Sequence, residues 1–237
     1  MHKFGGKSNE FQINRLHLNC FMNFLQTFLI LTLLPLTSVA QIYYIETNDI
    51  EVTKENEKIE DPFTRGFNNA QFSGIDLNQD GIMDLVITDR FFNAVIPYIN
   101  AGIADSIHYT YAPEYIDKFP PMNQVLVTRD YNDDGKMDLF VCGNSIDLYE
   151  NISTINGGLS FQLVDKLKTK YNPSSSFIGV LNPNAINYPA IEDIDGDKDI
   201  DIISRSTSRT LDYHRNLSID SNNNFNTLYE RRSPCWG

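Results

Sequence analysis

The stretch DLNQDGIMDLVI, residues 76–87, recurs twice in related form: as DYNDDGKMDLFV from residue 130 and as DIDGDKDIDIIS from residue 193. In each copy oxygen-bearing side chains stand at positions 1, 3, 5 and 9, and an apolar run follows directly. Calcium is a hard cation that takes about six to eight oxygen ligands in flexible geometry. The three copies therefore predict three calcium loops, each of which leads into a β-strand.

The candidate ligands repeat from loop to loop. The side chains at positions 1, 3, 5 and 9 are expected to bind the ion, together with the backbone carbonyl of position 7. The candidates are Asp76, Asn78, Asp80, Ile82 and Asp84 in the first loop, Asp130, Asn132, Asp134, Lys136 and Asp138 in the second, and Asp193, Asp195, Asp197, Asp199 and Asp201 in the third. We expect Ca²⁺ at up to three sites.

Position 6 of each loop requires a sharp turn. Gly81 and Gly135 stand there in the first two loops, and glycine adopts a positive φ without steric cost. In the third loop the glycine stands at position 4, as Gly196, and Lys198 takes position 6. A side chain in left-handed geometry costs about 1–2 kcal/mol, so we expect this loop to be the least regular. The extra negative charge of Asp195, which replaces an asparagine, partly offsets that cost.

Two alternative interpretations of the loops are weaker. An EF-hand needs a bidentate glutamate at position 12, but Ile87, Val141 and Ser204 stand there. Aspartate, asparagine and glycine also gather in ordinary turns that bind no ion. Three clusters with matched positions, each ending in aspartate and two apolar residues, favour calcium loops over turns alone.

The repeat is larger than the loop. The loops begin 54 and then 63 residues apart, which is the length of a propeller blade or a similar unit. Four strand candidates accompany each loop: one before it, one directly after it, a third that ends near a tyrosine and an asparagine, and a fourth beyond a polar loop. They span 70–75, 85–88, 94–100 and 106–111, then 124–129, 139–142, 146–151 and 159–164, then 188–192, 200–203, 210–216 and 225–229.

Aromatic and β-branched residues are frequent in these segments, and no amphipathic helix is convincing after residue 40. The sequence therefore predicts an all-β, β-propeller-like fold with three four-stranded blades. Propellers usually close with about four to eight blades, so we expect an incomplete propeller. The chain would be truncated, or the propeller would close by oligomerisation. Tyr98, Tyr149 and Tyr213, near the ends of the third strands, are expected to pack between blades.

The N-terminal region is typical of a secretory signal. An apolar run from Phe24 to Leu36 precedes Ser38-Val39-Ala40, where small residues predict cleavage. Residues 1–21 form an extended n-region or precede a start at Met22. An uncleaved membrane anchor is the alternative, because 21–40 is long enough to span a bilayer. The expected organisation is a signal peptide (1–40), a strand-rich lead-in (41–69), blades at 70–116, 117–170 and 171–230, and an irregular tail (231–237).

The repeats resemble the FG-GAP/VCBS repeat family, whose calcium-loop blades also occur in integrin α-subunit propellers. The resemblance covers about residues 65 to 218 and rests on the three loops and on the segments 71–73, 111–115 and 188–190. Within the family the chain is similar to the N-terminal part of secreted repeat proteins of Bacteroidetes-type bacteria. The resemblance implies calcium at positions 1, 3, 5 and 9 and a secreted or cell-surface location. Lys198 departs from the glycine or asparagine usual at position 6.

Charge and cysteine content restrict the partners. The formal net charge of −12 excludes nucleic acid as an expected partner, since phosphate binding needs a basic surface. Twelve of the 31 acidic residues lie inside the three loops, so much of this charge belongs to the expected metal sites. After residue 40 only Cys142 and Cys235 remain, too few for a disulfide framework. The sequences Asn151-Ile-Ser and Asn216-Leu-Ser match the N-glycosylation pattern.

The sequence gives no sign of catalysis. It has no H-E-x-x-H, G-x-S-x-G, G-x-G-x-x-G or P-loop motif, and His2, His17, His108 and His214 show no zinc-site spacing. We therefore expect a non-enzymatic binding or adhesion module that recognises a protein or carbohydrate surface ligand. It would contact a membrane only if the N-terminal helix stays uncleaved. Alternatively, the blades are an accessory part of a larger extracellular enzyme whose catalytic part follows Gly237.

Overall fold

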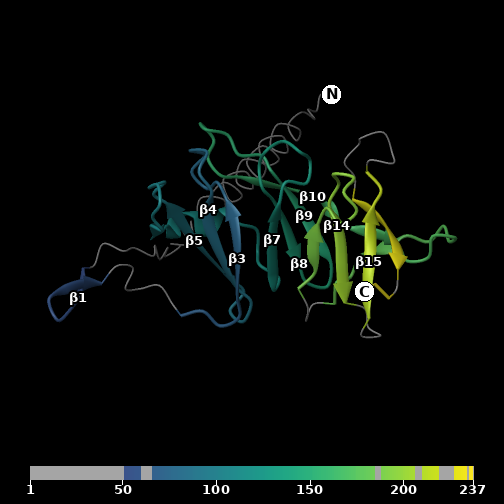
Figure 1. The fold of residues 1–237 in the computed structure, drawn as a ribbon, viewed down its shortest axis with the longest axis horizontal. Helices are drawn as coiled ribbons and strands as arrows, with labels where there is room; N and C mark the ends of the chain where they lie inside the picture. Colours follow the sequence, from purple (N-terminus) through teal and green to yellow (C-terminus); the bar gives the residue numbers. More distant parts are fainter. Residues whose placement is uncertain are drawn as a thin grey trace, which may run out of the picture. The chain divides into compact units, whose positions relative to one another are not determined.

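The computed structural model describes residues 51–59, 66–184, 188–205, 210–218, 227–233 and 235–236. The predicted signal peptide and the start of the lead-in lie outside the described residues. Within them no helix is long and apolar enough to cross a membrane. The described chain is all-β, as predicted, with several sheets that do not close on themselves (Figure 1). Its strands pair antiparallel except for one parallel pair in the third repeat.

The first two repeats each form a four-stranded antiparallel sheet in which neighbouring strands follow one another in sequence. The first sheet contains β3 (Ala70–Ile75), β4 (Asp84–Asp89), β5 (Ala94–Asn100) and β6 (Tyr109–Tyr111). The second contains β7 (Val125–Arg129), β8 (Asp138–Cys142), β9 (Ile146–Asn151) and β10 (Phe161–Lys166). The 3₁₀-helix η1 (Pro113–Lys118) connects them, and a separate hairpin consists of β1 (Val52–Lys54) and β2 (Glu57–Ile59).

The third sheet has six strands in the order β12-β11-β16-β15-β14-β13. Four of them are the repeat strands β13 (Ala190–Glu192), β14 (Asp201–Arg205), β15 (Leu211–Asn216) and β16 (Leu228–Ser233). The other two extend the sheet beyond β16: β11 (Lys168–Lys170) pairs with β16 in parallel, and β12 (Gly179–Val180) pairs with β11.

The six-stranded sheet shifts two expected boundaries. β11 belongs to the third sheet although it precedes the predicted boundary at 170, because Leu167 is fully buried in the core that joins the second and third sheets. Its short Lys-Thr-Lys sequence has no apolar alternation that would mark it as a strand. β16 extends to Ser233, so the predicted tail from 231 begins inside a strand. The twelve predicted repeat strands all occur, whereas a propeller arrangement of the sheets stays a prediction.

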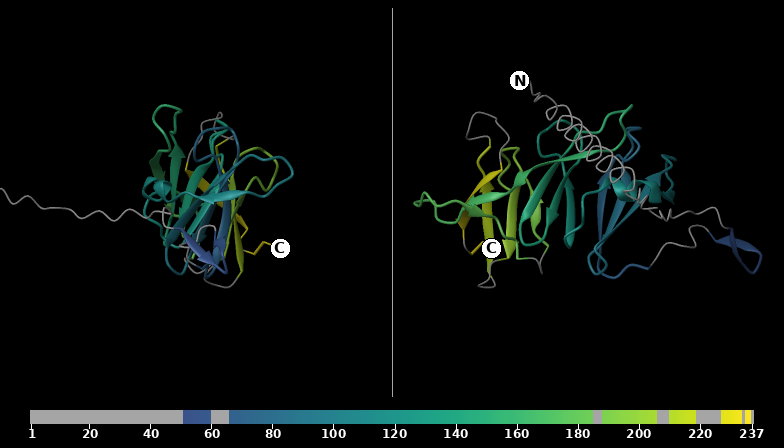
Figure 2. Two further views of the ribbon diagram at one scale, coloured as in Figure 1. Left: turned by 90° about the vertical axis from the view of Figure 1, so that its left-hand side faces the viewer. Right: turned by 180° about the vertical axis from the view of Figure 1, so that it is seen from behind.

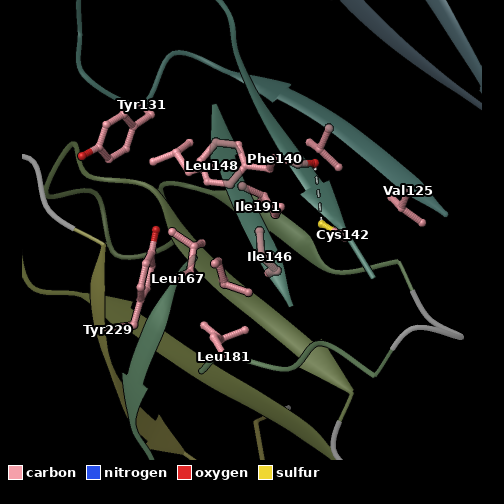
Figure 3. Close-up of a cluster of buried hydrophobic side chains, with 12 residues drawn as sticks. Val125, Tyr131, Phe140, Cys142, Ile146, Leu148, Leu167, Leu181, Ile191 and Tyr229 are labelled. Carbon is pink, nitrogen blue, oxygen red and sulfur yellow. Dashed lines mark hydrogen bonds between the residues drawn. The ribbon is translucent and has the colours of Figure 1, made fainter. Parts of the chain in front are cut away.

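Two apolar cores join the three sheets, and β8 contributes to both. Leu139 and Val141 point into the core shared with the first sheet. Phe140 and Cys142 point into the core shared with the third sheet, which contributes Ile191 and Tyr229 (Figure 3). Side chains alternate between the two faces of a strand, and a strand covered on both faces is apolar throughout. This explains the unbroken apolar run Leu-Phe-Val-Cys after the second loop.

The first strands of the repeats lie side by side, with β7 between β3 and β13 (Figures 1 and 2). The Thr128 hydroxyl donates to the Gly74 carbonyl at 2.8 Å, and Arg129 forms an ion pair with Glu192 at 2.6 Å. Gly74 and Thr128 both stand two residues before their loops, and Arg129 and Glu192 both stand one residue before theirs. The three loops therefore emerge at the same end of the sheets.

Replacement of Phe140 tests the core between the second and third sheets. Removing a buried phenyl ring costs about 3–5 kcal/mol, because apolar burial is lost and a cavity remains. We expect Phe140→Ala, at a fully buried position, to lower the free energy of unfolding in urea by that amount. Phe91→Ala, at a side chain that is 69% exposed, should change it by less than about 0.5 kcal/mol. Equal losses in the two variants would contradict this core.

Candidate metal centres

The fifteen predicted ligand residues lie in three hairpin connections of the same kind. Loop 1 (residues 76–84) joins β3 to β4, loop 2 (130–138) joins β7 to β8, and loop 3 (193–201) joins β13 to β14. Position 9 of each loop is the first residue of the following strand, namely Asp84, Asp138 or Asp201. The prediction of a loop that leads directly into a strand is confirmed.

Side-chain oxygens organise each loop by accepting hydrogen bonds from its backbone. In loop 2 the Asp130 carboxylate accepts from the N–H groups of Asp134 and Gly135, at 3.1 and 2.8 Å. Asn132 Oδ1 also accepts from Asp134, at 3.2 Å, and Asp134 Oδ1 accepts from Lys136 at 2.9 Å. Loop 1 has the same four bonds. Loop 3 differs only at position 1, whose carboxylate accepts from positions 4 and 6.

The backbone adopts the same two left-handed positions in every loop. At position 6 the φ angle is 85° at both glycines and 78° at Lys198, so the expected positive φ is confirmed. Position 4 is also left-handed, with φ of 62° at Gln79, 58° at Asp133 and 82° at Gly196. Each loop thus places one glycine and one side chain at these two positions. Loop 3 exchanges them, and its backbone is no less regular than the other two.

Position 9 carries a buried carboxylate in all three loops. Asp84, Asp138 and Asp201 are 2%, 0% and 0% exposed. One carboxylate oxygen accepts a hydrogen bond from the backbone N–H of position 2, at 2.8 to 3.3 Å. The other accepts from the N–H of the last residue of the third strand, at 2.7 or 2.8 Å. The position-9 aspartate therefore ties the loop to the third strand of its own sheet.

An asparagine at the end of each third strand completes this connection. Asn100, Asn151 and Asn216 donate from Nδ2 to the carbonyl of loop position 8, at 3.0 or 3.1 Å. Each accepts at Oδ1 from the backbone N–H two residues later, at 3.1 Å. The distance along the chain from loop to asparagine varies, so the sequence did not reveal this role. Asn151 and Asn216 are also buried, so their glycosylation patterns are not accessible in the folded protein.

The position-9 carboxyls lie in an environment that a cation would stabilise. Burial raises their pKa values, that of Asp138 to about 6, while backbone hydrogen bonds oppose the rise. Carboxylates elsewhere in the same loop raise these pKa values further, because a second negative charge disfavours ionisation. The candidate ligand atoms at positions 1, 3, 5 and 9 are all carboxylate or amide oxygens. Such a set suits Ca²⁺ better than metals that prefer thiolate or imidazole ligands.

Loop 3 differs from the others in its charges. Asp193, Asp195 and Asp197 place one carboxylate oxygen each within 4.8 Å of one another, a group that could hold a metal ion. Loops 1 and 2 have asparagine at the position of Asp195. Loop 3 also has a basic partner, since Arg215 pairs with Asp195 at 2.9 Å and with Asp197 at 3.1 Å. Burial raises the pKa of Asp197, but the Asp199 amide and Arg215 hold it below its usual value overall.

The strand register changes the expected correspondence of the tyrosines. In the first two sheets, Tyr98 and Tyr149 pair with the residue that directly follows position 9 of the loop. In the third sheet His214 occupies the corresponding position of the third strand. Tyr213, the residue before it, therefore lies on the opposite face of the sheet from the one that Tyr98 and Tyr149 occupy in theirs. His214 is buried and hydrogen-bonds through Nδ1 to Thr169 Oγ1 at 3.0 Å. Burial lowers the His214 pKa to about 4, so the ring is neutral at physiological pH. Tyr149 packs against the core between the first two sheets, as expected.

Comparisons of the chain with protein-family models, with curated proteins and with solved structures give no match.

Removal of the Asn151 side chain should destabilise the second sheet. Asn151→Ala leaves the Met137 carbonyl and the Ser153 N–H without their side-chain partner. An unsatisfied buried polar group costs about 1–3 kcal/mol, and we expect the free energy of unfolding in urea to fall by at least that amount. The matched control is Asn156→Ala at an exposed position of the following turn, which should have little effect. Similar stabilities of the two variants would exclude a structural role for Asn151.

Without calcium, ionisation of Asp138 should destabilise the folded protein. Folding raises its pKa from 3.8 to about 6, so the folded state binds the proton more tightly than the unfolded state. This contribution to stability is fully present below about pH 4 and is lost as the pH rises through 6. The free energy of unfolding of the wild type minus that of Asp138→Asn, measured in chelator, should fall by about 3 kcal/mol over this range. A pH-independent difference would contradict the raised pKa.

Proposed function

We propose that this protein is a calcium-binding repeat protein of FG-GAP/VCBS type, secreted or displayed at the cell surface, which acts as a non-enzymatic binding or adhesion module. The observation that carries the proposal is the threefold occurrence of one loop architecture. Every loop combines oxygen side chains at positions 1, 3 and 5 with a buried carboxylate at position 9. An ordinary turn needs no such buried charge.

Calcium would act as a structural ion at up to three loops. The side chains at positions 1, 3, 5 and 9 would supply ligands, joined by the carbonyls of Ile82, Lys136 and Asp199. Its positive charge would offset the repulsion among the loop carboxylates. Because the position-9 aspartate also holds the third strand, an ion in the loop would stabilise three strands at once. Binding to the folded state alone stabilises that state by mass action.

The arrangement of the sheets supports an incomplete propeller. The first strands lie side by side, all loops emerge at one end, and successive sheets share apolar cores. Propeller blades pack face to face around their first strands in this manner. A fourth and further blades, or another copy of the chain, would cover the outer faces of the first and third sheets.

A cavity between loops 1 and 2 supports a role in binding. It has a volume of about 280 Å³, and its lining includes Asp76, Met83, Lys136 and Ile155. This volume falls just below the range of about 300–1,000 Å³ that is usual for small-molecule pockets. A single side chain of a larger partner fits such a cavity better than a complete small-molecule substrate. Ile155 on its rim is 87% exposed and offers an apolar contact.

Calcium should raise the melting temperature, and a chelator should reverse the effect. Saturation at 100 times the dissociation constant stabilises a protein by about 2.7 kcal/mol per site. Thermal unfolding followed by circular dichroism, in chelator and in millimolar calcium, measures this difference. An unchanged melting temperature would overturn the assignment of calcium.

Two neighbouring aspartates in loop 2 offer a matched test of the ligand set. Asp134→Ala removes a predicted ligand, whereas Asp133→Asn removes the same charge from position 4. Asparagine is chosen there because it tolerates the positive φ of 58° at this residue. Calorimetric titration should show one calcium fewer for Asp134→Ala and an unchanged number for Asp133→Asn. Equal effects of the two changes would point to general charge attraction instead of coordination.

A further inference from the structure

The third strand of each sheet has two corresponding positions on one face near the loop, and the side chains at these positions differ among the repeats. The first position is the strand-pairing partner of the second residue after loop position 9. The second position directly precedes the asparagine that ends the third strand. They are Pro97 and Ile99 in β5, Leu148 and Glu150 in β9, and Tyr213 and Arg215 in β15. Only the third pair consists of two hydrogen-bond donors.

In loop 3 these donors already bind the oxygens that a cation would need. Arg215 Nε lies 2.9 Å from Asp195 Oδ2, and Arg215 Nη2 lies 3.1 Å from Asp197 Oδ2. The Tyr213 hydroxyl donates to Asp201 Oδ2 at 2.9 Å and lies 3.4 Å from Asp195 Oδ2. The carboxylates at positions 3, 5 and 9 are therefore all bound by side-chain donors of β15.

The corresponding side chains of the first two sheets bring no positive charge to loops 1 and 2. Ile99 packs against the core between the first and second sheets and brings no charge. Glu150 brings a further carboxylate to loop 2, where its Oε1 lies 3.5 Å from Asn132 Nδ2. Lys136 reaches Asp134 at 3.8 Å, but its side chain is 44% exposed, and such surface pairs contribute little.

The guanidinium group is suited to a permanent role in loop 3. It keeps its charge at all relevant pH values, and its planar fork can bind two carboxylates at once. The Arg215 side chain is only 23% exposed, which strengthens ion pairs relative to those in open solvent. A calcium ion in this loop would have to displace Arg215 or lie beside it, and like charges repel.

We infer that Arg215 takes the place of a calcium ion in loop 3, so that loops 1 and 2 bind calcium and loop 3 folds without it. The inference rests on the proposed function of loops 1 and 2 and specifies which loops respond to the ion. The acidic group of Asp193, Asp195 and Asp197 is then an arginine-binding site within the chain. The first two repeats depend on calcium concentration, whereas the third does not.

Exchange of the third-strand residues between loops tests this directly by calorimetric titration of the whole chain with calcium. The wild type should bind two ions. Arg215→Glu, which copies loop 2, should bind three, and Glu150→Arg, which copies loop 3, should bind one. The matched control is Arg232→Glu, which makes the same charge change on the neighbouring strand β16, at a partly exposed side chain that pairs with Glu230 rather than with loop 3, and should still bind two ions. Arg215→Ile copies loop 1 and provides a second variant if Arg215→Glu does not fold.

Three bound ions in the wild type, or two in both folded Arg215 variants, would overturn the inference. Hydrogen exchange of the amides of residues 193–201, measured in chelator, gives a readout that needs no metal. These amides should be protected in the wild type, and Arg215→Ile should speed their exchange about tenfold or more. Absence of calcium binding to the wild type would refute the proposed calcium role. Faster exchange in Arg215→Ile would still support the role of Arg215 in stabilising loop 3. Unchanged exchange would refute that role as well.

Discussion

A buried aspartate with two backbone hydrogen bonds is the interaction on which each repeat depends. Asp84, Asp138 and Asp201 each begin a strand, close the preceding loop and hold the end of the third strand. Burial of a carboxylate is costly unless hydrogen bonds and opposite charge compensate for it. Two N–H groups supply part of this compensation in every repeat. Under the proposed calcium role a cation would supply the remainder, from an ion in loops 1 and 2 and from Arg215 in loop 3.

Packing between the sheets follows a second constraint, which is strongest for the middle sheet. β8 is covered on both faces, so all of its side chains must be apolar after the initial Asp138. The first and third sheets share only one core each with the middle sheet. Apart from this shared core, the first sheet has only a small cluster of Ile87, Ile96 and Tyr111 beside η1. This asymmetry agrees with a series of repeats whose two ends differ from its centre.

Local patterns in the sequence were sufficient to predict the twelve repeat strands, the loops and the left-handed conformation at position 6. These features depend on neighbouring residues, such as alternation along a strand or a glycine in a turn. The contacts of Arg215 and Tyr213 with loop 3 could not be predicted in this way, because they depend on the pairing of β14 with β15. The asparagine connection depends on register for the same reason. β11 was missed because its three residues carry no apolar pattern.

The loops are closed by hydrogen bonds between their own side chains and backbone, and none of these bonds requires a metal atom. Loop 3 keeps the same fold although its glycine stands at position 4 and a lysine at position 6. Shape and ion chemistry are therefore separable properties of this repeat. Under the proposed calcium role, one repeat could exchange its ion for an internal arginine while its neighbours keep theirs. The repeats of such a protein could then change their ion chemistry one at a time, because each loop keeps its fold during the change.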